Sequence, residues 1–295
     1  MTEKILLDTD IGSDIDDAVG LTYLLMQPAC ELVGITTVSG QGLLRARLAS
    51  VICLAASNNE VPIHIGAETP LIVKQRQPIA QQADRLHNWP HAAIFPEIPA
   101  VEFMAKVILQ NPGEVTLLAI GPLTNLALLF SVYPETADAL KGLVIMGGVF
   151  KDDPNNPWKE EWNILLDPHA AEIVYNTPIA IHRSVGLDVT RQVRLPAEQV
   201  RSRFSHKVLK PVLDFAKVWF AEQEELIFHD PLAAVTIFEP DVCKFTQGLV
   251  TVNSDAAAGP LGATKFITNH DTKPHEAALS VNPGTFFESF FSVFQ

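Results

Sequence analysis

Residues 4–26 read KILLDTDIGSDIDDAVGLTYLLM, and this stretch decides the fold. The apolar run at residues 4–7 has the length of a buried strand, whereas residues 16–26 carry the longer apolar period of a helix. A second strand-like run follows at residues 31–38. This order of strand, helix and strand predicts a βαβ unit, in which the two strands lie parallel in one sheet.

The same alternation continues along the chain. It predicts an α/β fold of Rossmann-like topology, with one domain over residues 1–295 and a mostly parallel central sheet flanked by helices. Ligands of such sheets bind at the carboxyl ends of the strands. The further elements expected are strands at 61–65, 115–120, 143–146 and 179–182, and helices at 43–56, 101–110, 123–133, 168–175, 207–228 and 231–238, with irregular loops at 75–99 and 150–162.

Composition excludes several classes of partner. The chain has 295 residues with 21 Lys+Arg against 34 Asp+Glu, a formal net charge of −13. This balance lacks the basic surface that nucleic acids or anionic membranes require. No apolar run approaches the roughly 20 residues of a membrane span, and the first ten residues lack the pattern of a signal peptide. Three widely spaced cysteines in apolar contexts predict reduced thiols in a cytoplasmic protein.

Five aspartates crowd into the ten positions between the first strand and the first helix: Asp8, Asp10, Asp14, Asp16 and Asp17. Like charges at this density repel unless a cation lies among them, and carboxylate oxygens are the ligands that Ca²⁺ prefers. The simpler interpretation is that these residues cap a helix and form a turn. Neither an EF-hand nor a P-loop fits the spacing. A phosphatase with Asp8 as its nucleophile stays open, because such enzymes also end their first strand in DxD.

A second acidic group lies far downstream, where His229 and Asp230 precede the apolar residues of a predicted helix. Asp230 could complete a cation site with the N-terminal aspartates. His229 could then donate a proton to a leaving group, since histidine titrates near neutral pH. By itself this pair fits a helix start equally well.

Taken together, the motifs resemble the nucleoside hydrolase family of inosine–uridine-preferring N-ribohydrolases. The resemblance extends over nearly the whole chain, and the motifs occur in the family's order. They are DTDIGSDIDDA at 8–18, ITTVSG at 35–40, TLLAIGPLTNLA at 116–127, VIMGG at 144–148, EWN at 161–163 with DP at 167–168, GLDVT at 186–190 and HDP at 229–231.

The resemblance implies a Ca²⁺-dependent hydrolysis of the N-glycosidic bond of purine or pyrimidine ribonucleosides, which yields ribose and free base for nucleoside salvage or catabolism. It implies that Asp10 binds the metal and accepts a proton from the attacking water, and that His229 lies near the leaving base. It also implies a homodimer or homotetramer. The remaining implied residues are Asp17, Asp230 and the carbonyl of Ile120 for the metal, and Asp16, Gln41, His87, Asn155, Glu161 and Asn163 for the substrate.

Three departures from the family pattern concern the acidic motif and the base pocket. The acidic motif has Ile11 in place of proline and two additional residues, which leaves Asp14 without an assigned role. Gln41 replaces an asparagine, and the loop around His87 lacks the family's glycine-rich continuation. Tryptophans in the two irregular loops could stack on a base or could simply pack. These departures keep a second hypothesis open, namely a nucleoside- or ribose-binding protein that has lost turnover.

Overall fold

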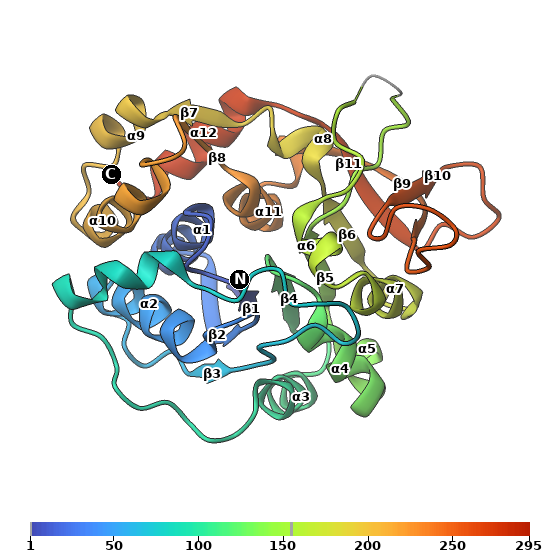
Figure 1. Ribbon diagram of the computed structural model, residues 1–295, viewed down its shortest axis with the longest axis horizontal. Helices are drawn as coiled ribbons and strands as arrows, with labels where there is room; N and C mark the ends of the chain where they lie inside the picture. Colours follow the sequence, from blue (N-terminus) through green and yellow to red (C-terminus); the bar gives the residue numbers. More distant parts are fainter. Residues whose placement is uncertain (1, 154–155) are drawn as a thin grey trace.

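The computed structural model describes residues 2–153 and 156–295. Within these residues a nine-stranded sheet runs through the middle of the molecule, with helices on both faces (Figure 1). Its strand order is β10-β9-β11-β6-β5-β4-β1-β2-β3, and a separate pair joins β7 and β8. The strands are β1 (Glu3–Thr9), β2 (Cys30–Thr37), β3 (Ile63–Ile65), β4 (Val115–Ala119), β5 (Gly142–Met146), β6 (His182–Val185), β7 (Arg194–Pro196), β8 (Glu225–Ile227), β9 (Cys243–Val252), β10 (Thr264–Ile267) and β11 (His275–Val281).

The helices divide between the two faces of the sheet. One buried cluster packs α1, α2, α10, α11 and α12 on one face, and a second packs α3, α4, α5 and α7 on the other. Their bounds are α1 (Asp16–Met26), α2 (Gly42–Ala55), α3 (Ala100–Gln110), α4 (Thr124–Val132), α5 (Glu135–Ala139), α6 (Trp162–Leu166), α7 (Pro168–Asn176), α8 (Leu187–Thr190), α9 (Ala197–Arg203), α10 (Lys210–Trp219), α11 (His229–Phe238) and α12 (Pro283–Ser292), with 3₁₀ turns at η1 (Gln81–Asn88), η2 (Lys207–Leu209) and η3 (Pro240–Val242).

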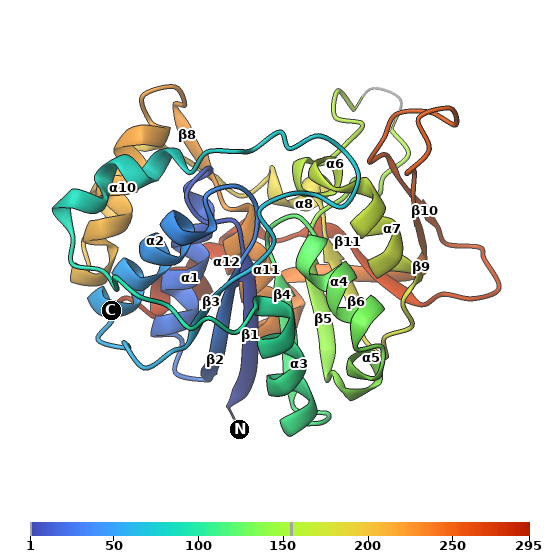
Figure 2. The ribbon, with the colours of Figure 1, turned by 60° about the horizontal axis from the view of Figure 1, so that its bottom comes forward.

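Strand β1 is an interior strand of the sheet, parallel to β2 on one side and to β4 on the other. Its residues Ile5, Leu6 and Leu7 have no exposed surface, because helices cover the strand on both faces. The chain leaves β1 towards β2 and β3, and later returns on the opposite side to form β4, β5 and β6. The strand order therefore reverses beside β1, which is where open α/β sheets bind their ligands. In Figure 2 the loops at the carboxyl ends of these strands gather along the upper edge of the sheet.

The predicted mostly parallel sheet is confirmed, although its C-terminal edge is antiparallel. Strand β11 pairs parallel to β6 but antiparallel to β9, which in turn pairs antiparallel to β10. The strand predicted at residues 179–182 was placed too early, since only its last residue belongs to β6. The hydrogen bonds with β5 begin at His182, so this register and not the apolar run decides where the strand starts.

The helix predicted over residues 207–228 is also wrong. Helix α10 ends at Trp219, and the chain then turns into β8, which pairs antiparallel with β7. Leu226 is fully buried while its two neighbours are half-buried, the alternation of a strand that lies on a core. Pairing with β7 therefore prevails over the local preference for helix.

The phenylalanine-rich tail forms α12. Phe286 and Phe290 are fully buried and stack with ring centroids 5.6 Å apart. Phe290 also stacks on Tyr23 of α1 at 5.7 Å. Helix α12 therefore packs against α1, the helix that follows the acidic loop. Among the described residues, no helix is both long enough and apolar enough to cross a membrane.

Candidate active site

The acidic stretch forms the loop between β1 and α1. Asp16 and Asp17 open the first turn of α1, where free N–H groups and the helix dipole favour carboxylates. The side chains of Asp10, Asp16 and Asp17 are at most 5% exposed. Gly12 enables the turn, because its φ of 120° disfavours any side chain and a Cβ there would lie 2.7 Å from Leu48. The sequence thus folds its aspartates inward and away from bulk water.

Asp230 reaches the same place from the opposite end of the chain, because α11 packs against α1. Its backbone N–H donates a hydrogen bond to Asp16 Oδ2 at 3.0 Å. Asp16, Asp17 and Asp230 each offer an oxygen, and these three oxygens lie within 4.8 Å of one another. Three buried carboxylates at this spacing fit a hard divalent cation, which oxygen ligands surround.

Burial raises the pKa of Asp16, Asp17 and Asp230 well above the ordinary range, and the neighbouring aspartates raise it further. Burial likewise raises the pKa of Asp14 to about 7. A bound cation would reverse this effect, since it stabilises the ionised carboxylates. The cluster therefore has the electrostatic character of a metal site, because a cation would stabilise its buried carboxylates in their ionised form.

Beneath the loop lies Arg45, a fully buried arginine of α2. Its guanidinium donates to the carbonyl oxygens of Gly40 at 2.8 Å and Ile11 at 3.2 Å, and also to that of Asp10. These bonds fix the backbone of the acidic loop. The positive charge also favours the ionised form of Asp10, but burial outweighs it and raises the pKa of that carboxyl.

Gln77 links Asp10 to the far wall of the site. Its amide nitrogen donates to Asp10 Oδ2, and its amide oxygen accepts a 2.8 Å hydrogen bond from the indole of Trp162. Gly121 lies on the other side of Asp10, where an added Cβ would lie 2.9 Å from Asp10 Oδ1. Gln77 thus engages one carboxylate oxygen of Asp10, while the absence of a side chain at Gly121 leaves room for the other.

Glu161 and Asn163 stand opposite the aspartates, at the start of α6. Glu161 accepts hydrogen bonds from the backbone N–H groups of Asn163, Ile164 and Gly148, and burial raises its pKa to about 7. The Asn163 amide donates to the carbonyl of Ile120 at 3.1 Å. The structure therefore brings Ile120, expected as a metal ligand, into contact with a residue expected to bind substrate.

His229 lies at the N-terminal end of α11, with its Nδ1 2.7 Å from the hydroxyl of Thr190. Burial, and to a smaller extent the charge of Arg191, lowers its pKa to about 3. The imidazole is therefore neutral at pH 7, whereas an unperturbed histidine would titrate near neutrality. Its Nε2 is the ring nitrogen left free for a ligand.

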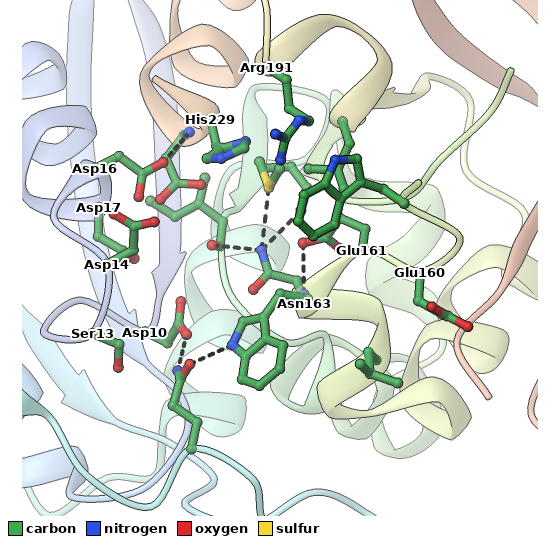
Figure 3. A pocket seen from close by; sticks show the side chains of 18 of the residues that line it. Asp10, Ser13, Asp14, Asp16, Asp17, Glu160, Glu161, Asn163, Arg191 and His229 are labelled. Carbon is green, nitrogen blue, oxygen red and sulfur yellow. Dashed lines mark hydrogen bonds between the residues drawn. The ribbon is translucent and has the colours of Figure 1, made fainter. Parts of the chain in front are cut away.

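These side chains surround one cavity of about 560 Å³, within the range of small-molecule sites. Figure 3 shows Asp10, Asp16, Asp17, Glu161, Asn163 and His229 around it. The cavity thus unites nearly all the site residues predicted from sequence. They come from the loops after β1 and β4, the start of α6 and the start of α11: Asp10, Asp16, Asp17, Ile120, Glu161, Asn163, His229 and Asp230.

Two predicted residues, Gln41 and His87, do not join the cavity lining. Gln41 precedes α2 with φ at 63°, and its side-chain oxygen accepts from the backbone N–H of Ala80, so it holds the loop and does not face the cavity. His87 is exposed on η1, where the turn directs Leu86 inward instead. Asn155 lies outside the described residues.

Asp8, the nucleophile of the phosphatase alternative, lies beneath the cavity and has no exposed surface. Its Oδ1 accepts hydrogen bonds from Thr36 and Asn125. Its Oδ2 is equally buried, so neither oxygen of Asp8 reaches a substrate in the cavity and the phosphatase alternative loses its nucleophile.

Sequence reasoning missed several contributors to the site, among them Arg45, Gln77, Gln81 and Arg191. Arg45 sits among apolar residues of a helix, and an arginine in that setting was its available signal. The glutamines lie in an irregular loop whose path only the tertiary structure reveals. Trp158, Trp162 and Trp219 line the cavity, whereas Trp89 donates its indole N–H to Asp214 outside it.

The comparison with family models decides the identity. Residues 5–288 match the model described as inosine-uridine preferring nucleoside hydrolase.

The chain belongs to the nucleoside hydrolase family.

This hydrolase acts on N-glycosyl compounds. It is 32% identical over 271 residues to a probable uridine nucleosidase 1 of Oryza sativa subsp. japonica, covering 85% of this chain and 82% of that one. It is 30% identical over 287 residues to the pyrimidine-specific ribonucleoside hydrolase RihA of Escherichia coli, covering 86% and 89%.

Solved structures agree on the fold of this nucleoside hydrolase. A plant nucleoside hydrolase superposes with a TM-score of 0.85 at 24% identity, covering 100% of this chain and 99% of that one. A purine-preferring ribonucleoside hydrolase from Gardnerella vaginalis gives 0.85 at 24% identity, covering 99% and 98%.

Proposed function

We propose that this nucleoside hydrolase cleaves the N-glycosidic bond of purine or pyrimidine ribonucleosides to ribose and free base, with Ca²⁺ as its cofactor, in nucleoside salvage or catabolism. The observation that carries the proposal is the cavity itself, where buried carboxylates from both ends of the chain face the Glu161–Asn163 pair. Relatives named for uridine and pyrimidines support pyrimidine nucleosides, and a structure named for purines supports retaining purines as candidates.

Asp17 and Asp230, together with Asp10 and the carbonyl of Ile120, are our proposed Ca²⁺ ligands. The closeness of Asp16 to Asp17 and Asp230 makes it a further candidate, so its predicted contact with ribose and a contact with the cation are compatible roles. When bound, the cation would lower the pKa of the attacking water and accept the sugar hydroxyls into its oxygen shell. The chain's own residues perform the remaining steps.

Asp10 is the proposed general base. It lines the cavity beside the other aspartates, so its carboxylate can take a proton from a water molecule held there. The hydrogen bond from Gln77 engages Oδ2 and so fixes the orientation of the carboxylate. Positioning of this kind lets the base meet the water in one geometry, which avoids an entropic cost in the transition state.

The aspartates also act on the sugar. As the bond from C1′ to the base nitrogen breaks, positive charge grows on the ribosyl ring. Carboxylates close to the ring stabilise this charge more than they stabilise the neutral substrate, so they accelerate the step and do not merely bind. Glu161 and Asn163, already fixed by hydrogen bonds, would accept and donate hydrogen bonds with the ribose hydroxyls.

His229 is proposed to act at the leaving base. With Nδ1 held by Thr190, a neutral ring can present an N–H at Nε2. Such a donor would stabilise the departing nitrogen or an atom conjugated to it. Because the low pKa of His229 favours the neutral ring, we expect this donor to be an imidazole and not an imidazolium.

Location and assembly form part of the same proposal. Free thiols at Cys30, Cys53 and Cys243 suit the reducing cytoplasm. Exposed apolar side chains such as Ile72 and Ile94 would be compatible with a homodimer or homotetramer, which light scattering at several concentrations would detect.

A screen of common purine and pyrimidine ribonucleosides tests the function, with reducing sugar and free base both measured. We expect both products in equal amounts with Ca²⁺ present, and none after chelation until Ca²⁺ is restored. No reducing sugar from any nucleoside would contradict hydrolysis. Heat of binding without product, measured by calorimetry, would instead identify a nucleoside-binding protein that has lost turnover.

A further inference from the structure

Arg191 is the only lysine or arginine among the described residues that line the cavity, where seven acidic residues also stand. It directly follows α8, whose last residue, Thr190, contacts His229. Figure 3 shows Arg191 at the same end of the cavity as His229, with Asp10 at the other end. A single positive charge thus lies on the side of His229, near the proposed place of the base.

The guanidinium of Arg191 has no hydrogen bond or ion pair with the part of the chain that the structure describes. It lies over the ring of Trp158 instead, 4.3 Å from the ring centroid. The nearby Glu225 is paired with Arg194 at 3.3 Å. Glu225 therefore attracts Arg191 only at longer range, and in a chain of net charge −13 a half-buried arginine without a hydrogen-bonded acidic partner among the described residues is unusual. Its N–H donors remain available to a ligand.

This arrangement costs stability in the free protein. Partial burial lowers the pKa of Arg191, and the like charge of Arg194 lowers it further, although a guanidinium stays protonated. The ring of Trp158 holds the planar group in place from one side. A positioned cation whose donors are unsatisfied until a ligand arrives fits the recognition of an anion or of a group that becomes one.

We propose that Arg191 binds an exocyclic oxygen of the leaving base and stabilises the negative charge that the base acquires during cleavage. This inference rests on the proposed function. The bond between C1′ and the base nitrogen breaks, and both of its electrons leave with the base. The oxygen of water bonds to C1′ as one of its protons is lost to the general base, and the departing base finally takes up a proton, so the products are ribose and neutral base.

The chemistry of the base explains why an arginine suits this position. In a base that carries an exocyclic oxygen, the negative charge left by bond cleavage spreads over the ring nitrogens to that oxygen. A guanidinium donates to such an oxygen in the ground state and binds it more strongly as charge develops, so the contact lowers the barrier as well as aiding binding. His229 and Arg191 would therefore act on the leaving base together.

The test compares wild-type protein with Arg191→Met and Arg194→Met, each saturated with Ca²⁺. Methionine keeps apolar contact with Trp158 and removes the charge, while Arg194→Met removes the same charge three residues away, outside the cavity lining. Two substrates are used: the nucleoside that the wild type hydrolyses fastest, and p-nitrophenyl β-D-ribofuranoside, whose leaving group departs without assistance.

We expect Arg191→Met to lower kcat on the nucleoside by about 10²–10³-fold, the usual effect of removing one preorganised donor. The same variant should hydrolyse the p-nitrophenyl riboside at close to the wild-type rate. Arg194→Met should hydrolyse both substrates at close to the wild-type rate. A third variant, Arg191→Ala, leaves space for a small molecule in place of the guanidinium. Millimolar guanidinium should partly restore its activity on the nucleoside, whereas urea, which has a similar shape and no charge, should not.

Equal losses on both substrates, or no loss on either, would overturn the role of Arg191, because a structural or sugar-binding defect does not depend on the leaving group. Rescue by urea to the same extent would also overturn it. Failure of the proposed function is distinguishable, since the wild type itself would then release no reducing sugar from any nucleoside.

Discussion

The two ends of the cavity are built differently. The acidic end comes from the loop between β1 and α1 and from the start of α11. Its residues Asp10, Asp16, Asp17 and Asp230 are at most 5% exposed. The opposite end includes Trp158, which is 45% exposed, lies in the irregular loop before α6 and packs against Arg191. Chemistry common to every nucleoside thus rests on rigid elements, while the part suited to contact the base is carried by loops that can vary.

The largest expected effect removes the acidic end's proposed base. Asp10→Ala should lower kcat/KM by about 10⁴-fold, which corresponds to over 5 kcal/mol, because both proton transfer and a cation ligand would be lost. Steady-state release of reducing sugar measures the change. Asp84→Ala, at an exposed position on η1 outside the cavity lining, is the matched control and should retain full activity. Substantial activity in Asp10→Ala would mean that the acidic end does not hold the base.

The next effect concerns the support under the acidic end. Arg45→Met should reduce the free energy of unfolding by about 3–5 kcal/mol, because it leaves buried carbonyls and carboxylates without their cationic partner. Urea denaturation of the metal-free protein measures this loss. The exposed Arg194→Met should alter it little. Equal stabilities of the Arg45 variant and the wild type would show that the acidic loop holds its shape unaided.

A smaller effect is expected at the loop end. Trp158→Ala should raise KM by up to about tenfold, because stacking contributes about 0.5–1.5 kcal/mol, while a half-exposed indole adds little to stability. Trp89→Ala provides the contrast: its indole binds Asp214 outside the cavity, so we expect a change in stability and none in KM. If Trp158→Ala lowers stability and leaves KM unchanged, this end of the cavity is structural.

The smallest effect is a gradual one with pH. Burial raises the pKa of Glu161 from 4.5 to about 7, so its neutral form is the one that the fold favours. Its contribution to stability is complete below the unfolded pKa and is lost as the pH rises through about 7. The raised pKa values of Asp16, Asp17 and Asp230 also make stability fall as the pH rises. The Tm of the metal-free protein should therefore fall by a few degrees between about pH 5 and pH 8.

Calcium should counteract this fall, because it pairs with the ionised carboxylates. Glu161→Gln cannot ionise at this position and should show a shallower dependence on pH. A metal-free Tm that rises with pH over the same interval would contradict the assigned direction of these pKa shifts.

Much of the fold follows from local pattern. Residues 16–26 were expected to form a helix and do so as α1, because a long apolar stretch and two aspartates at the first turn agree. The prediction of one helix over residues 207–228 was wrong because β7 supplies hydrogen bonds to β8 that no local pattern reveals. The antiparallel strands β9, β10 and β11 were missed for a related reason, since their apolar residues alternate only partly and pairing partners decide the assignment.

For the site, the sequence by itself determined the residue types and their chemistry: a dense group of aspartates, a distant His229–Asp230 pair, and the motif that contains Glu161 and Asn163. Only the tertiary structure decided which of these meet. It packed α11 against α1, turned Gln41 and His87 away from the cavity, and brought in Gln77 and Arg191. The physical reason is that charge and hydrogen-bonding capacity belong to each side chain, whereas proximity depends on how helices and loops pack on a shared sheet.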